Sequence, residues 1–407
     1  MEYKKLEEIA SSFKYGKMPQ KDRITTNGKY PIFSGYRCIG YYDEYNIEDN
    51  ELVFIARGVG GTGDVKLAPG KCFLTNLSIA VKFNEELVNY KFLYYYFLIN
   101  NLRYLDSGSA QSQITINDLK SVKVPVPSMS IQKKVVNILE NLDKKIELNN
   151  KINNNLQEMI NSIFKSWFID FEFPNKDGHP YKSSKGKMID SKLGKIPENW
   201  KVIKLDNIID FSNGYSIDSK KMLDKEEKNT YKVFKMGNIK PLGGINKYKT
   251  KSWLKKDNCK GLEKYISKKG DILMCMTDMK NSDTPLLGHT ALIDKDNEFI
   301  INQRVGILRC KKELVNYPFV YTLTNLDFFV KDIRSRANSG VQVNLSTKGI
   351  CETTLIFPNK KILDEFNNIT EPMYEKMFKN NDENEVLTQI RDTLLPKLMK
   401  GEINLKK

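Results

Sequence analysis

The chain contains one long segment twice. The pentapeptide Glu-Leu-Val-Asn-Tyr at 86–90 recurs unchanged at 313–317. From Gln111 to Ile163 the sequence stays in register, without a gap, with the segment from Gln342 to Leu394. A repeat of about 200 residues is far longer than the roughly 20–50 residues of solenoid repeats, so it indicates a duplicated domain. Two similar modules on one chain predict a protein that reads two similar targets at a fixed separation.

The charge of the chain favours a polyanionic partner. A length of 407 residues and an apolar share of 40% leave room for about two or three domains with real cores. The formal net charge of +15 favours nucleic acid first and an acidic membrane surface second. The alternative is that the many Lys, Asn and Ile residues reflect only a biased genome.

Several classes of protein are disfavoured. No apolar run approaches the length of about 18 residues that a membrane span needs, and the N-terminus lacks the apolar core of a signal peptide. Six scattered cysteines without a Cys-x-x-Cys pair are typical of free thiols in a cytoplasmic protein. With only two histidines, His179 and His289, the chain is poorly equipped for a zinc site or a histidine-dependent triad.

The first copy begins with strands and ends with a long helix. Short runs rich in strand formers at 52–56 and 78–83 predict strands, and 90–99 predicts a buried helix. Two prolines at 125 and 127 end the module. Apolar residues then follow in alternating steps of three and four, the pattern of a coiled coil, and the second copy repeats it. The predicted core positions are Val135, Ile138, Leu142, Lys145, Asn149, Ile152, Leu156, Met159 and Ile163, and Phe366, Ile369, Met373, Lys376, Asn380, Leu387, Ile390 and Leu394.

Polar residues interrupt both helices at matching positions, since the register of the repeat aligns Lys376 with Lys145 and Asn380 with Asn149. If a two-fold axis relates the helices, the polar residues form a central layer that fixes the register. The expected pairs are Asn149 with Lys376, Lys145 with Asn380, Leu156 with Ile369, Ile138 with Leu387, and Met159 with Phe366. The alternative is that the polar side chains point at solvent or at another subunit.

No catalytic motif stands out. The segment 58–63 has the letters G-x-G-x-x-G, but the residues after it read as strand and turn, so we expect a turn that approaches another backbone or a phosphate. The chain has no phosphate-binding G-x-x-x-x-G-K-[ST] loop and no Asn/Asp-Pro-Pro-aromatic tetrapeptide. Glu226-Glu227-Lys228 supplies half of a nuclease motif, without a well-placed partner acid. We therefore expect no catalytic, cofactor or metal site.

Basic and aromatic residues are interleaved in the expected loops, where Lys and Arg can bind phosphates and Arg can also fork onto guanine edges. Taken singly, each is more readily explained as a solvated surface charge. The candidates for DNA contact are Lys17, Lys21, Arg23, Arg37, Arg57 and Lys66 in the first module, and Lys235, Lys240, Lys247, Lys249, Lys251, Lys280, Arg304, Arg334 and Arg336 in the second.

Four stretches resemble the specificity subunits (HsdS) of type I restriction–modification systems. They are the module start at 196–205, the Gly-rich turn at 56–63, the helix end at 164–171 and the C-terminal signature at 394–403. The N-terminus departs from the family because it lacks a Pro-x-x-Trp lead-in, and Met274–Asp278 replaces the second Gly-rich turn. The resemblance implies an α/β (α+β) fold with two target recognition domains and two long helices in a pseudo-two-fold antiparallel coiled coil. The implied divisions are recognition domain 1 (1–127), conserved helix 1 (128–171), a basic, poorly structured linker (172–197), recognition domain 2 (198–358) and conserved helix 2 (359–407).

The resemblance also implies partners. Each recognition domain would read one half of a split, asymmetric sequence in double-stranded DNA, and the helices would set the spacing. Two methyltransferase subunits would dock on the helices and carry S-adenosylmethionine. A restriction subunit, where the system has one, would bring ATP and Mg²⁺. This chain would bind no cofactor, meet no membrane and catalyse nothing. The competing classes are a self-contained enzyme, which lacks its motifs here, and a coiled-coil scaffold or RNA-binding protein.

Overall fold

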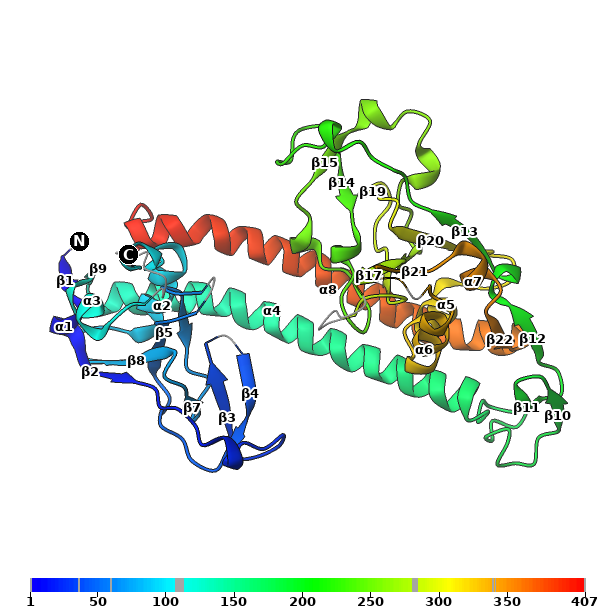
Figure 1. Ribbon diagram of the computed structural model, residues 1–407, viewed down its shortest axis with the longest axis horizontal. Coiled ribbons are helices and arrows are strands. Elements are labelled where there is room, and N and C mark those ends of the chain that lie inside the picture. Colours follow the sequence, from blue (N-terminus) through cyan, green and yellow to red (C-terminus); the bar gives the residue numbers. More distant parts are fainter. Residues whose placement is uncertain are drawn as a thin grey trace. The chain divides into compact units, whose positions relative to one another are not determined.

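The computed structural model describes residues 2–35, 37–58, 61–106, 113–279, 285–338, 340 and 342–405 (Figure 1). The chain forms two compact units. Unit 1 comprises Met1–Asn149 together with Asp382–Lys407, and unit 2 comprises Asn150–Asn381. Each unit therefore contains one module and one part of each long helix. The two ends of the chain both belong to unit 1.

The module of unit 1 is built on antiparallel strands with one parallel pair. A four-stranded sheet has the order β2-β8-β5-β6, and a three-stranded sheet has the order β4-β3-β7, in which β3 and β7 are parallel. The elements are β1 (Tyr3–Lys5), α1 (Leu6–Ile9), β2 (Ala10–Tyr15), β3 (Tyr30–Ser34), β4 (Arg37–Tyr42), β5 (Glu51–Ile55), β6 (Val65–Leu67), β7 (Phe73–Leu74), β8 (Ser78–Phe83), α2 (Tyr90–Ile99), α3 (Ile116–Ser121) and β9 (Lys123–Pro125).

The helix α2 packs its aromatic residues against the larger sheet. Phe54 of β5 meets Phe97 of α2 edge to face, with ring centroids 5.3 Å apart. Asn89 caps α2 by accepting a hydrogen bond from the Lys91 amide at 2.9 Å. The Asn89 amide in turn donates to the side chain of buried Gln132, which ties the module to the first turn of the long helix.

The module of unit 2 repeats this topology. Its larger sheet has the order β13-β20-β16-β18, and its smaller sheet has the order β15-β14-β19 with β14 and β19 parallel. Strand β12 pairs with β22 as β1 pairs with β9. The elements are β12 (Lys201–Lys204), β13 (Ile209–Asn213), β14 (Thr230–Phe234), β15 (Trp253–Lys255), β16 (Ile272–Cys275), β17 (Thr277–Met279), β18 (Thr290–Leu292), β19 (Phe299–Ile301), β20 (Val305–Cys310), α5 (Tyr317–Thr324), α6 (Asp327–Ser335), β21 (Gln342–Asn344), α7 (Thr347–Cys351) and β22 (Thr354–Phe357). The two sheets and the β1–β9 and β12–β22 pairs confirm the duplication inferred from the repeat.

Two glycines show how closely the copies agree. The Gly16 amide donates to Ser78 O at 3.1 Å, and the Gly214 amide donates to Val305 O at 2.9 Å, at the same place in the two larger sheets. A Cβ at Gly16 would lie 2.1 Å from Thr75 O, and one at Gly214 would lie 2.3 Å from Asn302 O. Any side chain at either position would clash with backbone, so both copies require glycine where the two sheets meet.

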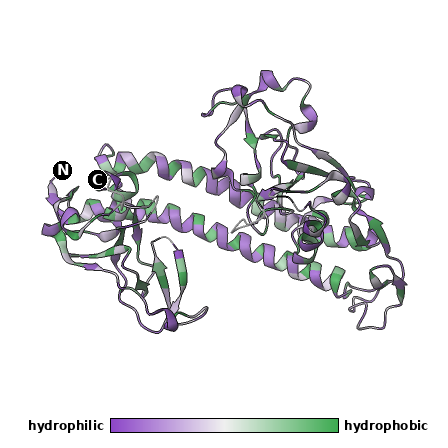
Figure 2. Cartoon of the chain, in the orientation of Figure 1, coloured by the Kyte–Doolittle hydropathy of each residue, from purple (hydrophilic) through white to green (hydrophobic). Residues whose placement is uncertain are grey.

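The long helices are α4 (Met129–Phe164), which continues into a π-helical turn, η3 (Lys165–Ile169), and α8 (Lys360–Lys400). Apolar and polar residues alternate along both helices in Figure 2, as an amphipathic helix requires. In unit 1, Val135 and Leu139 of α4 share a core with Leu395 and Leu398 of α8. In unit 2, Ile160 and Phe164 of α4 share a core with Phe366 and Tyr374 of α8. The helices pair as an antiparallel coiled coil.

The predicted register of this pair is wrong. Asn149 lies against Asn384 in unit 1, with Nδ2 donating to Oδ1 at 3.0 Å, and not against Lys376. Asn380 lies against Asn153 in unit 2, at 2.8 Å, and not against Lys145. An asparagine carries both a donor and an acceptor, so two of them satisfy each other inside a core, whereas an ammonium group only donates and is costly to bury. Lys145 instead lies half exposed beside Glu383, with Nζ 3.2 Å from a carboxylate oxygen.

Burial separates the predicted core positions into three groups. Val135, Asn149, Phe366 and Asn380 are buried; Ile138, Leu142, Ile152, Leu156, Ile163, Met373, Leu387 and Leu394 are partly buried; and Lys145, Met159, Ile369, Lys376 and Ile390 are exposed. The exposed apolar positions contradict the prediction. They follow from the register, because the buried seam runs through Asn153 and Ile160 and turns the side chain of Met159 outward.

The segment between the modules is better ordered than predicted. Strands β10 (Met188–Ser191) and β11 (Gly194–Pro197) form a hairpin there. The ring of Phe173 stacks between Tyr181, at 4.6 Å, and Trp200, at 5.0 Å. The composition of the segment is basic, but its few aromatic residues pack into the core of unit 2. This packing fixes the backbone of the segment. None of the helices in the described part of the chain is long and apolar enough to cross a membrane.

Candidate nucleic-acid interface

Three exposed cations of unit 1 surround one turn between β7 and β8. The Lys17 amide donates to Leu74 O at 2.9 Å, and the Arg57 amide donates to Leu77 O at 3.1 Å. The Thr75 amide donates to Phe33 O at 3.0 Å, beside the β3–β4 hairpin end where Ser34 pairs with Arg37. Backbone hydrogen bonds therefore gather Lys17, Arg37 and Arg57, which we call the cationic corner of unit 1. Their side chains project into solvent, where they can meet phosphate.

Unit 2 has a corner at the equivalent turn between β19 and β20, with different side chains. The Tyr215 amide donates to Ile301 O at 2.8 Å, as Lys17 does to Leu74. The Met276 amide donates to Arg304 O at 3.2 Å, and the Asn302 amide donates to Phe234 O, the residue before Lys235. Arg304 and Lys235, both exposed, form the cationic corner of unit 2. Lys235 also donates to Ser252 Oγ at 2.8 Å, next to exposed Lys251.

Tyr215 was not among the sequence candidates. It stands where unit 1 has Lys17, and its ring lies 5.3 Å from the ring of Tyr265. An aromatic face at this position can pack against a sugar or a base. The signal for it in the sequence is weak, because the two copies differ here in both residue type and loop length.

Two candidates are engaged in ion pairs within the modules. Arg23 binds Asp43 at 2.6 Å and Glu44 at 2.5 Å and lies over the Tyr42 ring, and the hydrogen bond from Arg23 lowers the pKa of Asp43. Lys247 lies 3.1 Å from the carboxylate of buried Asp294 and 3.3 Å from that of partly buried Glu298. These arginine and lysine side chains hold loops in place.

Three further candidates are also held within the modules. Arg334 donates to Leu287 O at 2.8 Å and to Pro285 O at 3.0 Å. Arg336, the C-cap residue of α6, binds Asp332 of that helix at 3.0 Å. Lys66 is partly buried, and burial lowers its pKa. None of these three belongs to a cationic corner.

The remaining candidates stand apart from the corners. Lys21, Lys240 and Lys249 are exposed, but they do not take part in the hydrogen bonds described above that gather the corner residues. Lys280 lies outside the described residues. The structure therefore brings together Lys17, Arg37 and Arg57 in one module, and Lys235, Lys251 and Arg304 in the other.

The Gly-rich turn lies against the end of α2. A Cβ at Gly63, whose φ is +90°, would lie 2.5 Å from both Arg103 N and Leu102 C. The Leu102 amide donates to Gly63 O at 2.9 Å, and strand β6 follows the turn directly. The turn thus brings two backbones together, as expected, and the strand after it is incompatible with a dinucleotide-binding helix.

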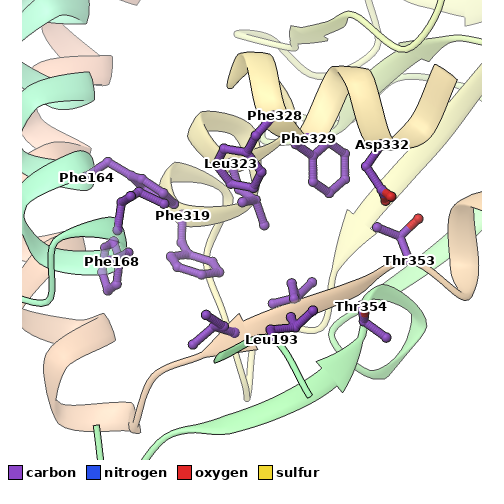
Figure 3. Close-up of a pocket in the computed structure, with 13 residues that line it drawn as sticks. Phe164, Phe168, Leu193, Phe319, Leu323, Phe328, Phe329, Asp332, Thr353 and Thr354 are labelled. Atoms are coloured by element: carbon purple, nitrogen blue, oxygen red, sulfur yellow. The ribbon is translucent and has the colours of Figure 1, made fainter. Parts of the chain in front are cut away.

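A cavity of about 340 Å³ in unit 2 is lined mainly by apolar side chains, unlike the cationic corners (Figure 3). Phe164 and Phe168 form one wall, Phe319 and Phe329 another, and strand β22 contributes Leu355. Asp332, whose carboxylate binds Arg336, is the one charged residue among those that line it. An apolar lining with a carboxylate at its edge does not suit a nucleic acid, so the cavity is not part of the candidate interface.

Comparison with known proteins finds one domain twice in this chain. The family model described as the type I restriction modification DNA specificity domain matches residues 1–158 and 197–385. The chain is 27% identical over 325 residues to the MjaIX specificity subunit of a type I restriction enzyme from Methanocaldococcus jannaschii, an alignment that covers 77% of this chain and 69% of the relative. It is 24% identical over 387 residues to the HindI specificity subunit from Haemophilus influenzae, an alignment that covers 81% and 82%.

A solved structure has the same fold. The crystal structure of the S subunit of a type I restriction–modification system from M. genitalium aligns with a TM-score of 0.60. The alignment covers 98% of this chain and 95% of that chain at 20% sequence identity. At this identity the likeness concerns the fold alone.

Proposed function

The chain belongs to the family of type I restriction–modification DNA specificity subunits, and we propose that each of its modules reads one half of a bipartite target in double-stranded DNA. The two cationic corners carry the proposal. The backbone position of exposed Lys17 in one module is occupied by Tyr215 in the other, and the position of exposed Arg57 is occupied by Thr277, whose side chain is buried. Unlike side chains at equivalent positions read unlike bases, so the target is asymmetric.

The long helices set the spacer between the two halves in this proposal. Helix α4 has 36 residues, and at about 1.5 Å per residue it spans about 54 Å. At about 3.4 Å per base pair, this length corresponds to an upper limit near 16 base pairs between the centres of the half-sites. The asparagine pairs support such a role, because a buried polar pair permits only one register.

Catalysis belongs to the partners in this proposal. Two methyltransferase subunits dock on α4 and α8 and bring S-adenosylmethionine, and a restriction subunit, where the system has one, brings ATP and Mg²⁺. The chain supplies the recognition of the DNA sequence and the spacing between its two halves. The cationic corners support this division of roles, since they contain Lys and Arg suited to phosphate and base contacts.

Methylation mapping tests the proposal. The chain is co-expressed with a candidate type I methyltransferase subunit in a host that lacks such systems, and modified adenines are mapped by single-molecule sequencing. We expect one bipartite, asymmetric motif. A stable complex with duplex DNA but not with RNA of the same sequence distinguishes this function from that of an RNA-binding scaffold.

Two results contradict the proposal. If the chain fails to co-purify with every methyltransferase subunit encoded beside it, the assembly is wrong and the scaffold alternative is favoured. If the motif is continuous or palindromic, the assignment of one unlike half-site to each module is wrong. The spacer length in the motif tests the limit set by the helices.

A further inference from the structure

In both modules, an equivalent pair of backbone hydrogen bonds closes a hairpin turn at the end of a central strand. In unit 1, Ile55 accepts a hydrogen bond from the Gly63 amide and donates one to Asp64 O, both at 2.9 Å. In unit 2, Cys275 makes the same two bonds with Gly288 and His289, also at 2.9 Å. Both glycines have a positive φ, +90° at Gly63 and +79° at Gly288. Asp64 and His289 are therefore equivalent residues.

One arginine clamps this turn in unit 1. Arg103, just after α2, donates from Nε to Asp64 Oδ1 at 3.1 Å and from Nη2 to Asp64 Oδ2 at 2.9 Å. Such a two-pronged pair constrains direction as well as distance. Together with the bond from the Leu102 amide to Gly63 O, it fixes the turn to the end of the helix.

An equivalent arginine clamps the turn in unit 2 through different acceptors. Arg334 stands at the position that matches Arg103 when the register of the gapless repeat is extended toward the N-terminus. Because His289 stands where Asp64 stands, the fork of Arg334 has no carboxylate there and bonds the carbonyl oxygens of Leu287 and Pro285. Burial lowers the pKa of His289, and the Arg334 charge lowers it further, so the histidine stays neutral beside the arginine.

The clamped turns hold the residues of the cationic corners. In unit 1, Arg57 follows shortly after Ile55, so the hydrogen bonds of Ile55 to the turn determine where Arg57 leaves the strand. In unit 2, Met276 follows Cys275 and donates to Arg304 O. A displacement of either turn would move the cation that the corner presents.

We propose that Arg103 and Arg334 are positioning residues for half-site reading, each acting through its hairpin turn on its own module. The inference rests on the proposed function. Each arginine is responsible for one half of the target, so its removal relaxes that half and leaves the other half unchanged.

Methylation mapping of variants tests the inference in the complex with the same methyltransferase subunit. Arg103→Ala is expected to raise methylation about tenfold at sites with one altered base in one half, the discrimination that a base contact ordinarily supplies. Arg334→Ala does the same in the other half. Arg103→Lys behaves like the alanine variant, because one ammonium group cannot form the fork. The exchange Arg103→Asp with Asp64→Arg restores the motif.

The controls separate the possible failures. Lys187→Ala removes an exposed ion pair with Glu198 and leaves the motif unchanged. Amide hydrogen exchange reports the clamp without methylation, and Arg103→Ala is expected to speed exchange at Leu102 and Gly63. If the wild-type complex yields no bipartite motif, the proposed function itself fails. If the wild-type motif is present and both alanine variants keep it unaltered, or lower methylation equally at all sites, the inference is overturned.

Discussion

Asn149 and Asn384 bond each other through their side-chain amides at 3.0 Å in the core of the helix pair of unit 1. Asn380 and Asn153 form the equivalent pair in unit 2, at 2.8 Å, because the repeat aligns Asn380 with Asn149 and Asn384 with Asn153. The repeat thus places an asparagine pair in the helix pair of each unit. Sliding one helix by a turn would leave these amides buried without partners, at a cost of about 1–3 kcal/mol each.

Replacing one member of this pair is expected to destabilise the chain. Asn149→Ala leaves the Asn384 side chain in the core with one fewer partner, so the free energy of unfolding falls by about 1–3 kcal/mol. Urea titration measures it, and Asn141→Ala, an exposed position on the same helix, is the control. The double variant with Asn384→Ala loses less than the sum of the single changes, since the pair is coupled. Strict additivity would mean that the bond contributes nothing.

Asp143 is expected to stabilise the contact between the first module and the long helices. Its carboxylate accepts from Tyr95 Oη at 2.6 Å and from Arg391 Nη1 at 2.9 Å. Asp143→Ala leaves the buried Tyr95 hydroxyl without this acceptor and lowers the free energy of unfolding by about 1–2 kcal/mol. Asp392→Ala, which removes the more exposed carboxylate bound by Arg391, costs less than about 1 kcal/mol. Equal losses for the two variants would contradict the role of the buried hydroxyl.

The cationic corner of unit 1 is expected to set the salt dependence of DNA binding. For each phosphate that Arg37→Ala or Arg57→Ala no longer neutralises, the slope of log K against log salt becomes shallower by about 0.9. The measurement is a DNA titration of the methyltransferase complex at several salt concentrations. The control is the double variant Lys5→Ala with Lys123→Ala. It removes two lysine charges whose residues are backbone register partners in the β1–β9 pair. An unchanged slope in Arg37→Ala and Arg57→Ala would remove these residues from the interface.

Acid is expected to destabilise the second module through His289. Its pKa lies below the ordinary value of 6.5, first because of burial and then because of Arg334, while Asp327 opposes the shift. In the unfolded chain this histidine binds a proton near pH 6.5, whereas in the native chain it binds one only at lower pH. The contribution of neutral His289 to the free energy of unfolding is therefore fully present above pH 6.5 and declines as the pH falls below it. The free energy of unfolding should fall less between about pH 7.5 and about pH 5.5 in His289→Gln than in the wild type. His179→Gln, at an exposed site, should behave like the wild type.

Local sequence patterns determined much of this protein. Residues 78–83 and 90–99 form the strand and helix that their patterns predict, because alternation and apolar density depend only on nearby residues. The gapless repeat determined the duplicated topology, since similar sequences fold into similar modules. The Gly-rich turn could likewise be predicted from the sequence, because Gly63 needs a backbone conformation that other residues rarely adopt.

The tertiary structure alone decided which residues meet. Helical periodicity allows several registers that differ by whole turns, and the asparagine pairs, Asn149 with Asn384 and Asn380 with Asn153, select one of them. The ordered segment around Phe173 was hidden by its basic composition, because a few aromatic residues in a distant core outweigh many solvated lysines. Arg57 and Arg334 carry the same charge in the sequence, yet one reaches solvent and the other holds a turn. Whether an arginine binds a partner or its own backbone depends on acceptors far away in the chain, which come close only after folding.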